Sequence, residues 1–281
     1  MASKLHNTIF RKGSKTYYFS SFFFPRAIKR DVYILYAFVR VADNLVDTED
    51  GSLEAFLDFK ERYRSALESR NASGDSVIDL FIDLMHRKGF DPAWVDAFLY
   101  SMEYDTGDEI CTSIDDTLRY IYGSAEVIGL FMARIMDLDE RSYQAAKMLG
   151  RAMQYINFIR DIDEDNGLKR RYIPLEGTPL ASLSRQEAYR QPEAFRAFIR
   201  REISRYHSWQ KQAEKGYSWI PRRLRIPIMT AADMYCWTSS VIYRDPFIVF
   251  ERKVKPSKRR ILRKGFARAV GVAASCYRYS K

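Results

Sequence analysis

Apolar residues recur at intervals of three and four along most of this chain, most clearly in 26–47, 113–136 and 142–165. This spacing gives a helix one apolar face. No segment shows the sustained two-residue alternation and hairpin turns of a sheet. The breaks between helical stretches are short, except for the Gly- and Pro-containing stretch 166–182, and none has the composition of a domain linker. We therefore predict an all-α protein in which residues 1–281 form a single domain.

Two of these stretches carry a column of polar side chains on a mostly apolar helix. The members of the columns are Tyr36, Arg40, Asp43 and Asp47 in the first, and Gln154, Asn157, Asp161 and Asp165 in the second. Steps of three and four residues place each column on one helical face. Each column therefore ends in an Asp-x-x-x-Asp pair.

The residues beside the two columns, "VYILYAFV" and "MQYINFI", are apolar, so we expect both columns to face the interior. Burying several unpaired carboxylates would cost several kcal/mol each, so positive charge must lie between them. Mg²⁺ accepts carboxylate and amide oxygens, and it prefers one or two protein carboxylates plus phosphate oxygens. The alternative is that the aspartates lie exposed on the surface, and this explains a single Asp-x-x-x-Asp pair better than two such pairs on apolar helices. The columns thus predict Mg²⁺ ions around a diphosphate, with Arg40 and Arg160 completing the charge balance.

Five segments together resemble a known family. "YAFVRVADNLVD" (36–47) and "QYINFIRDIDED" (154–165) are similar to the two aspartate-rich motifs of the squalene/phytoene synthase family, the head-to-head prenyl transferases. "SKTYYF" (14–19), "YIYGSAEVIG" (120–129) and "RRYIP" (170–174) match three further family motifs in the same order. The resemblance extends over residues 8 to 255 and is strongest to the bacterial and archaeal phytoene synthases.

The resemblance implies an isoprenoid-synthase helical bundle with a central cavity, in which two prenyl diphosphates bind through Mg²⁺, with Mn²⁺ as a substitute. The metal ligands that it implies are Asp43, Asp47, Asn157, Asp161 and Asp165. The substrate-binding residues that it implies are Ser14, Lys15, Thr16, Tyr36, Arg40, Gln154 and Arg160. Tyr36 and Tyr120 would line the reacting centre, where Tyr122 and Phe158 would add aromatic faces toward a carbocation. The four aspartates and these two tyrosines, Tyr36 and Tyr120, form the predicted catalytic set.

In family terms the reaction has two steps: a cyclopropyl diphosphate forms, then ionises and rearranges to a 1-1′ linked product. We predict condensation of two geranylgeranyl diphosphates to phytoene, a step of carotenoid biosynthesis. The alternative is a squalene or dehydrosqualene synthase that uses two farnesyl diphosphates. Reductive members bind NADPH without a G-x-G-x-x-G motif, so the absence of this motif here is weak evidence against NADPH use. The lack of the C-terminal anchor of eukaryotic members favours the non-reductive enzymes, and we expect no NADPH requirement.

The charge of the chain favours anionic partners. Lys and Arg number 46 against 36 Asp and Glu, a net charge of +10. Beyond Glu251 there is no acidic residue, and we predict a basic helix at about 257–278. This helix either packs on the bundle with a solvated basic face or rests on anionic lipid headgroups. A nucleic-acid-binding protein would leave the aspartates unexplained, and the intact Asp pairs argue against an inactive partner subunit. The sequence indicates no particular oligomeric state.

The sequence contains no secretory signal pattern and no run of about 18 apolar residues. Its three cysteines lie far apart without C-x-x-C spacing, which predicts neither a disulfide framework nor a cysteine zinc site. We therefore predict a cytoplasmic protein that is soluble or peripheral to a membrane.

Three further positions bear on the cavity. Glu126 stands where many family members have glycine, so we expect an acidic group near the cavity wall. Phe247 stands where some members have a tyrosine that can bond a diphosphate. Ser20 and Ser21 are small residues among aromatic ones; if Ser21 faces inward, it leaves room for an additional isoprene unit. The alternative is that both serines face solvent or a neighbouring helix.

Overall fold

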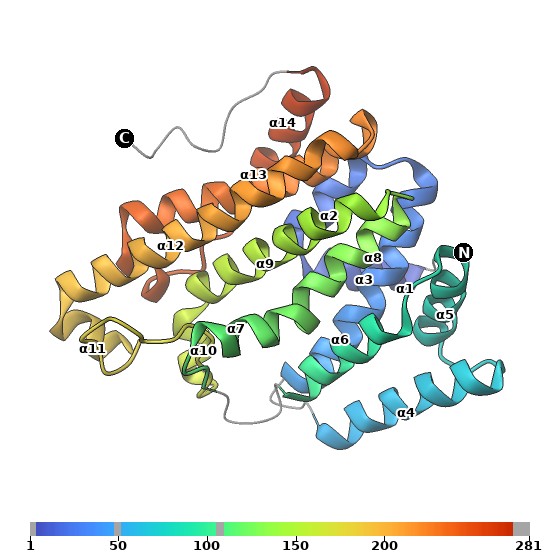
Figure 1. Ribbon diagram of the computed structural model, residues 1–281, viewed down its shortest axis with the longest axis horizontal. Helices are drawn as coiled ribbons and strands as arrows, with labels where there is room; N and C mark the ends of the chain where they lie inside the picture. The colour runs from blue at the N-terminus through green and yellow to red at the C-terminus, as the bar shows by residue number, and fades with distance from the viewer. Residues whose placement is uncertain (1–3, 48–51, 105–109, 272–281) are drawn as a thin grey trace.

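The computed structural model describes residues 4–47, 52–104 and 110–271, and these residues fold into a helical bundle (Figure 1). The α-helices are α1 (Lys4–Gly13), α2 (Lys15–Ser20), α3 (Arg26–Asp47), α4 (Leu53–Ser69), α5 (Ser76–Lys88), α6 (Pro92–Tyr104), α7 (Ile114–Ile121), α8 (Val127–Ile135), α9 (Tyr143–Arg160), α10 (Ile162–Gly167), α11 (Arg185–Arg190), α12 (Pro192–Glu214), α13 (Arg222–Arg244) and α14 (Lys258–Ala269). The 3₁₀-helices are η1 (Ser21–Phe23), η3 (Glu140–Ser142), η4 (Lys215–Trp219) and η5 (Pro246–Phe250), and η2 (Tyr122–Glu126) is a π-helix. The described residues contain no strand, only an isolated parallel bridge between Ile110 and Arg171. The all-α prediction is confirmed.

Helix α9 crosses the middle of the bundle and packs against α8, α12, α13 and η2 (Figure 1). The predicted helix 26–47 corresponds to α3. The predicted helix 142–165 is interrupted, because α9 ends at Arg160 and α10 begins at Ile162. Asp161 lies at the break, but the amide of Asp165 still donates to its carbonyl at 2.9 Å. Asp161 and Asp165 therefore remain one turn apart despite the break.

Two clusters of buried apolar residues form the core. The first surrounds α3, α5 and α6, where Phe38 stacks on Phe81 with ring centroids 3.8 Å apart. The second surrounds α9, α12 and η5, where Phe158 stacks on Tyr172 at 4.4 Å. Residues of both clusters line one central cavity. The cavity is thus a space between two separately packed halves of the core.

A glycine on α9 sets the distance between this helix and η2. A Cβ atom on Gly150 would lie 2.3 Å from the carbonyl oxygen of Ala125, a backbone atom that cannot move aside. Only glycine permits this approach. The close contact brings the η2 wall of the cavity against the helix that carries the second aspartate motif.

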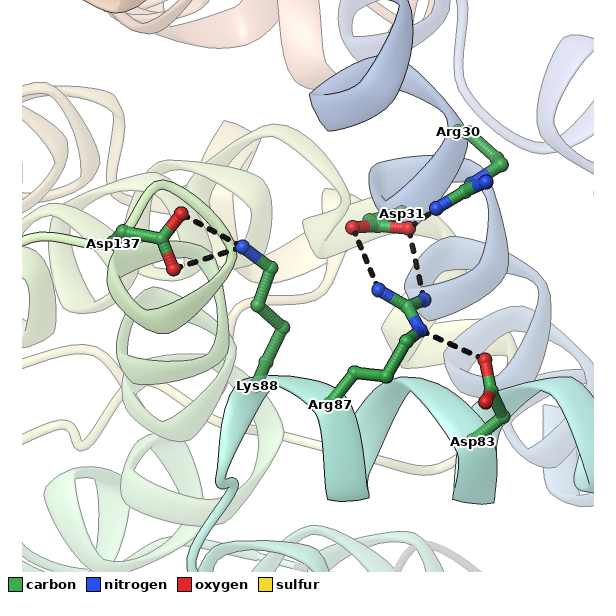
Figure 2. A network of polar contacts seen from close by, with 6 residues as sticks. All are labelled: Arg30, Asp31, Asp83, Arg87, Lys88 and Asp137. Carbon is green, nitrogen blue, oxygen red and sulfur yellow. Dashed lines mark hydrogen bonds and ion pairs between the residues drawn. The ribbon is translucent and has the colours of Figure 1, made fainter.

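Charged side chains tie α3 to α5 (Figure 2). Asp31 on α3 is buried and accepts two hydrogen bonds from the Arg87 guanidinium of α5, at 3.3 and 3.0 Å. Arg87 also bonds Asp83 at 2.8 Å, and Lys88 reaches Asp137, beyond α8, at 2.8 Å. A buried carboxylate is stable only with such partners. The network therefore fixes the first half of α3, the helix whose far end carries the first aspartate motif.

The structure bears on two further predictions, one about membrane-spanning helices and one about the cysteines. Among the described residues, no helix is both long and apolar enough to cross a membrane. Cys111 is a buried free thiol, whereas Cys236 is disulfide-bonded, which the spacing of the cysteines did not predict.

Candidate active site

A central cavity of about 780 Å³ brings the predicted site residues together. Those that line it are Ser14, Lys15, Thr16, Tyr36, Arg40, Asp43, Tyr120, Gln154, Asn157, Arg160, Asp161 and Asp165. Asp47 is the last residue of α3, and its side chain lies outside the described residues. Arg170 and Tyr172 of "RRYIP" also line it, so all five sequence motifs contribute to the same cavity.

The aspartates at this cavity carry their own counter-charges. Arg40 pairs with Asp43 on α3. The Arg160 guanidinium holds Asp161 through two bonds, Nε to Oδ1 at 2.8 Å and Nη2 to Oδ2 at 2.5 Å. The Asp43 and Asp161 side chains are 28% and 17% exposed, so both remain accessible from the cavity. The sequence predicted that Arg40 and Arg160 complete the charge balance by bonding phosphate, and the structure pairs them with the aspartates themselves.

Asp165 lies in a less balanced environment. Burial, followed by repulsion from Asp161 and Glu164, raises the pKa of its carboxyl from 3.8 to about 8, although Lys253 and Arg170 oppose the rise. On the basic side, burial lowers the pKa of Lys255, and the neighbouring charges of Lys253 and Arg160 add to this effect. Burial thus favours the neutral form of both a carboxyl and a lysine at one site.

The raised pKa predicts a pH effect on the stability of Asp165→Asn. In the wild type the folded carboxyl keeps its proton up to about pH 8, whereas the unfolded one loses it near 3.8. Wild-type stability therefore falls as pH rises through this window, and the asparagine variant escapes the fall. We expect the variant to have the higher Tm at pH 8 and an unchanged Tm below pH 3.8, measured by thermal unfolding without metal. A Tm difference that is independent of pH would contradict the assignment.

The residues present fit Mg²⁺ bound together with a diphosphate. Asn157 offers a buried Oδ1 atom that has no hydrogen-bond partner among the described residues. The described residues contain no cluster of three acidic, His or Cys side chains arranged to hold a metal alone. Mg²⁺ seldom requires one, because it binds one or two carboxylates and completes its shell with phosphate oxygens and water. The donor set therefore suits a metal that arrives with its substrate.

The "SKTYYF" motif forms the start of α2 at the cavity. Ser14 caps this helix by accepting a hydrogen bond from the Tyr17 amide at 3.3 Å. Lys15 and Thr16 line the cavity directly after it. Gly13, just before the cap, leaves space for Tyr36, since a Cβ atom there would lie 2.3 Å from the Tyr36 hydroxyl.

Tyr36 itself stacks on Phe10 at 4.0 Å, and burial raises the pKa of its hydroxyl well above the ordinary value. It is therefore a neutral, fixed ring in the wall.

Aromatic rings form a second part of the wall. Tyr120 stacks on Tyr172 at 4.8 Å, and Tyr172 stacks on Phe158 at 4.4 Å. All three line the cavity. Tyr122 does not, because it is two residues, or about 200°, from Tyr120 on the helix and points outward, where it is 40% exposed. The prediction that Tyr122 adds an aromatic face is wrong.

Sequence reasoning missed several lining residues. Tyr17, partly buried, and Tyr235, buried, have ring centroids 5.8 Å apart, and both line the cavity. Lys253 lies 3.2 Å from Asp161 and also pairs with Glu164, while Lys255 lines the same end. The alternation Lys253-x-Lys255 in an extended segment was the available signal, but the basic composition of the whole C-terminal stretch obscured it.

The two departures from the family pattern both lie away from the cavity. Glu126 is buried, but its Oε1 atom accepts from Arg151 Nε at 2.6 Å and it does not line the cavity. Phe247 packs against Phe195 and Tyr189 instead of facing the site. The expected acidic wall is therefore absent from the described lining residues.

The opposite part of the cavity is apolar. Ser20 and Ser21 are buried and line it, and their hydroxyls donate to the carbonyls of Tyr17 and Tyr18 at 3.1 and 2.7 Å. Apolar side chains around this part include Phe24, Val32, Leu35, Met132, Met136, Leu149 and Ile228. The inward position of Ser21 is confirmed.

Comparisons with known proteins agree with this arrangement. A family model described as squalene/phytoene synthase matches residues 10–260. The 15-cis-phytoene synthase of Pantoea ananas is 29% identical over 237 residues, covering 79% of this chain and 76% of the relative. The squalene synthase HpnC from Alicyclobacillus acidocaldarius superposes with a TM-score of 0.77 at 22% identity, over 87% of this chain and 94% of that chain. A dehydrosqualene synthase in complex with a ligand gives 0.76 at 21% identity, over 94% of each chain.

Proposed function

The chain belongs to the squalene/phytoene synthase family and is therefore a prenyl transferase, and we propose that it condenses two geranylgeranyl diphosphates head to head into phytoene. One observation carries the proposal: a single cavity has acidic and basic groups at one end and an apolar lining at the other. A prenyl diphosphate has the same division between its charged head and its hydrocarbon tail.

The first step that we propose is ionisation of one allylic diphosphate. The carbon–oxygen bond breaks, its electron pair leaves with the diphosphate, and the other substrate's double bond attacks the cation to give a cyclopropyl diphosphate after loss of a proton. Mg²⁺ held by Asp43, Asp47, Asn157, Asp161 and Asp165 would neutralise the leaving charge. Arg40, Arg160, Lys253 and Lys255 would bind the diphosphate oxygens by charge-assisted hydrogen bonds. Ser14, Lys15, Thr16 and Gln154 would position it.

The second step ionises the cyclopropyl diphosphate and rearranges its carbon skeleton to the 1-1′ link. A carbocation survives only where water is excluded, and aromatic faces stabilise it. The rings of Tyr36, Tyr120, Phe158 and Tyr172 line this part of the cavity, and the last three are buried. We propose that the final cation loses a proton, with no reduction by NADPH.

The test of this proposal is product analysis. The purified protein is incubated with Mg²⁺ and either geranylgeranyl or farnesyl diphosphate, with and without NADPH, and the hydrocarbon is identified by mass and absorbance. We expect a C40 triene chromophore from the C20 substrate in both conditions. A C30 product from farnesyl diphosphate, with none from the C20 substrate, would replace phytoene by the alternative, a squalene or dehydrosqualene synthase.

Ser21 provides a prediction about substrate length. Its hydroxyl lies among apolar residues at the tail end of the cavity, so Ser21→Phe fills volume that a longer tail needs. We expect the ratio of kcat/KM for the C20 over the C15 substrate to fall about 10-fold or more, the effect of losing ~1.4 kcal/mol of tail binding. Ser69→Phe, on the exposed side of α4, is the control. An unchanged ratio in Ser21→Phe would show that the tails lie elsewhere.

We further propose that the enzyme is cytoplasmic and meets its lipid substrates as a peripheral protein at an anionic membrane surface. The net charge of +10 and the described helices, none of which could cross a membrane, support this view.

A further inference from the structure

The basic residues of this chain are concentrated in its two terminal segments. Residues 1–30 contain seven Lys and Arg and residues 252–281 contain eleven, and neither segment contains Asp or Glu. The 221 residues between them hold the other 28 Lys and Arg together with all 36 Asp and Glu. The positive net charge of the protein therefore arises entirely from its two ends.

The fold brings the described parts of both segments together. Helix α14 packs against α2 and α13, and α1 packs against α2 (Figure 1). Gly265 on α14 lies against the Phe23 ring, and Lys258 lies 5.1 Å from the ring centre of Phe19. The described parts of the two basic segments are thus in direct contact.

Helix α14 has an inner and an outer face. On the inner face, Arg268 bonds the buried Asp233 of α13 at 2.8 and 2.7 Å, and Ile261 is fully buried. The outer face is a stripe at steps of four, three and four residues: Arg259, Arg263, Phe266 and Val270, all exposed. Phe266 and Val270 are 63% and 73% exposed. The helix is therefore anchored on one side and presents cations and apolar groups to the outside on the other.

The N-terminal segment, which packs against α14, carries an exposed ring of its own. Phe22 of η1 is 42% exposed, with the Lys29 ammonium 4.3 Å from its ring centre. Its neighbour Phe23 meets the Phe266 ring edge-on at 5.5 Å. The preceding residue, Ser21, lines the apolar end of the cavity. The exposed residue Phe22 and the cavity-lining residue Ser21 are therefore adjacent in the same short helix, η1.

We propose that this face, the basic docking face (Phe22, Lys29, Arg259, Arg263, Phe266 and Val270), rests on an anionic lipid bilayer. Arg and Lys bind lipid phosphates, and the exposed rings insert among the acyl chains beside them. A polyanion such as nucleic acid would satisfy the cations but leave the apolar groups in water. The inference rests on the proposed function in one respect, since prenyl substrates and products are themselves lipids. It places the apolar end of the cavity next to the membrane.

The experiment is co-sedimentation with vesicles of phosphatidylglycerol and phosphatidylcholine, compared with phosphatidylcholine alone, without substrate. Wild type should bind only the anionic vesicles, and less as salt increases. The pair Arg259→Glu and Arg263→Glu should weaken binding at least about 25-fold, because each surface arginine contributes roughly a fivefold factor. Phe266→Ser should weaken it at unchanged charge. Arg119→Glu and Tyr189→Ser, exposed elsewhere, are the matched controls.

Equal binding of neutral vesicles, or variants that bind like the controls, would overturn the proposal. So would wild-type binding to an oligonucleotide duplex that is tighter than its binding to the anionic vesicles. Turnover of detergent-dispersed substrate, measured on the same samples, separates this surface from the proposed function. Variants that lose vesicle binding should keep that turnover. If the double arginine variant loses both, circular dichroism tests whether it is misfolded. In that case vesicle binding by Phe266→Ser decides whether the proposal holds.

Discussion

Asp43→Asn and Asp161→Asn are each expected to lower kcat about a thousandfold, which corresponds to ~4 kcal/mol of transition-state stabilisation. The amide retains the shape of the side chain but loses the charge that holds a cation next to the leaving diphosphate. Both side chains face the cavity, and each is held in place by a neighbouring arginine. Steady-state kinetics with the C20 substrate at saturating Mg²⁺ measures the effect.

The matched control for this pair is Asp163→Asn. Asp163 is two residues from Asp161, but it is exposed and lies 3.5 Å from Arg185 on the outside. It should keep wild-type kcat. A stability measurement accompanies the kinetics, because Arg160 loses its bidentate partner in Asp161→Asn and we expect a modest decrease in Tm. Near-wild-type kcat in Asp43→Asn or in Asp161→Asn would show that the substituted aspartate has no role in the mechanism.

Complete loss of activity in EDTA, with recovery on adding Mg²⁺, is the second large effect that we expect. Arg40 and Arg160 are already paired with Asp43 and Asp161, so we expect Mg²⁺ to neutralise the charge that develops on the leaving diphosphate. Mn²⁺ should restore part of the rate, because it accepts the same oxygen ligands. EDTA saturated with Mg²⁺ beforehand is the control for effects of the chelator itself.

A second readout of the metal does not depend on turnover. Ligands that bind only the folded state raise its Tm. Inorganic diphosphate should therefore raise the Tm of the wild type much more with Mg²⁺ than without it, and the gain should be smaller in Asp161→Asn. Full turnover in EDTA would refute the metal site. So would a rise in Tm with diphosphate that is the same with and without Mg²⁺.

The sequence predicted the helices and the walls that their regular faces form. Periodicity placed α3 and the polar column Tyr36, Arg40 and Asp43 on its inner face, and these residues do line the cavity. It worked there because a regular helix converts spacing directly into direction. The family resemblance added residues such as Ser14 and Tyr120, whose spacing alone carried no such information.

The errors arose where spacing was not applied or does not apply. Tyr122 is two residues from Tyr120, which places it about 200° away on the helix and outside the cavity, and Glu126, at the end of the π-helix, accepts from Arg151. Lys253 and Lys255 lie in an extended segment, where helical spacing predicts nothing. Tyr17 and Tyr235 meet across helices distant in sequence, and such tertiary contacts leave no local pattern.

The π-helix η2 also determines which changes of length this enzyme can tolerate. It lies between α7, which carries Tyr120, and α8, so these two helices differ in register by the one residue that a π turn adds. An α-helix advances about 100° per residue. The five residues of this π segment cover about the same rotation as four residues of an α-helix, so deleting one residue of 122–126 would let the segment close into an ordinary α-helix with α7 and α8 still aligned and Tyr120 still at the cavity. A single deletion is therefore tolerated in η2, whereas the same deletion inside the regular helix α9 would rotate one end of that helix by about 100°.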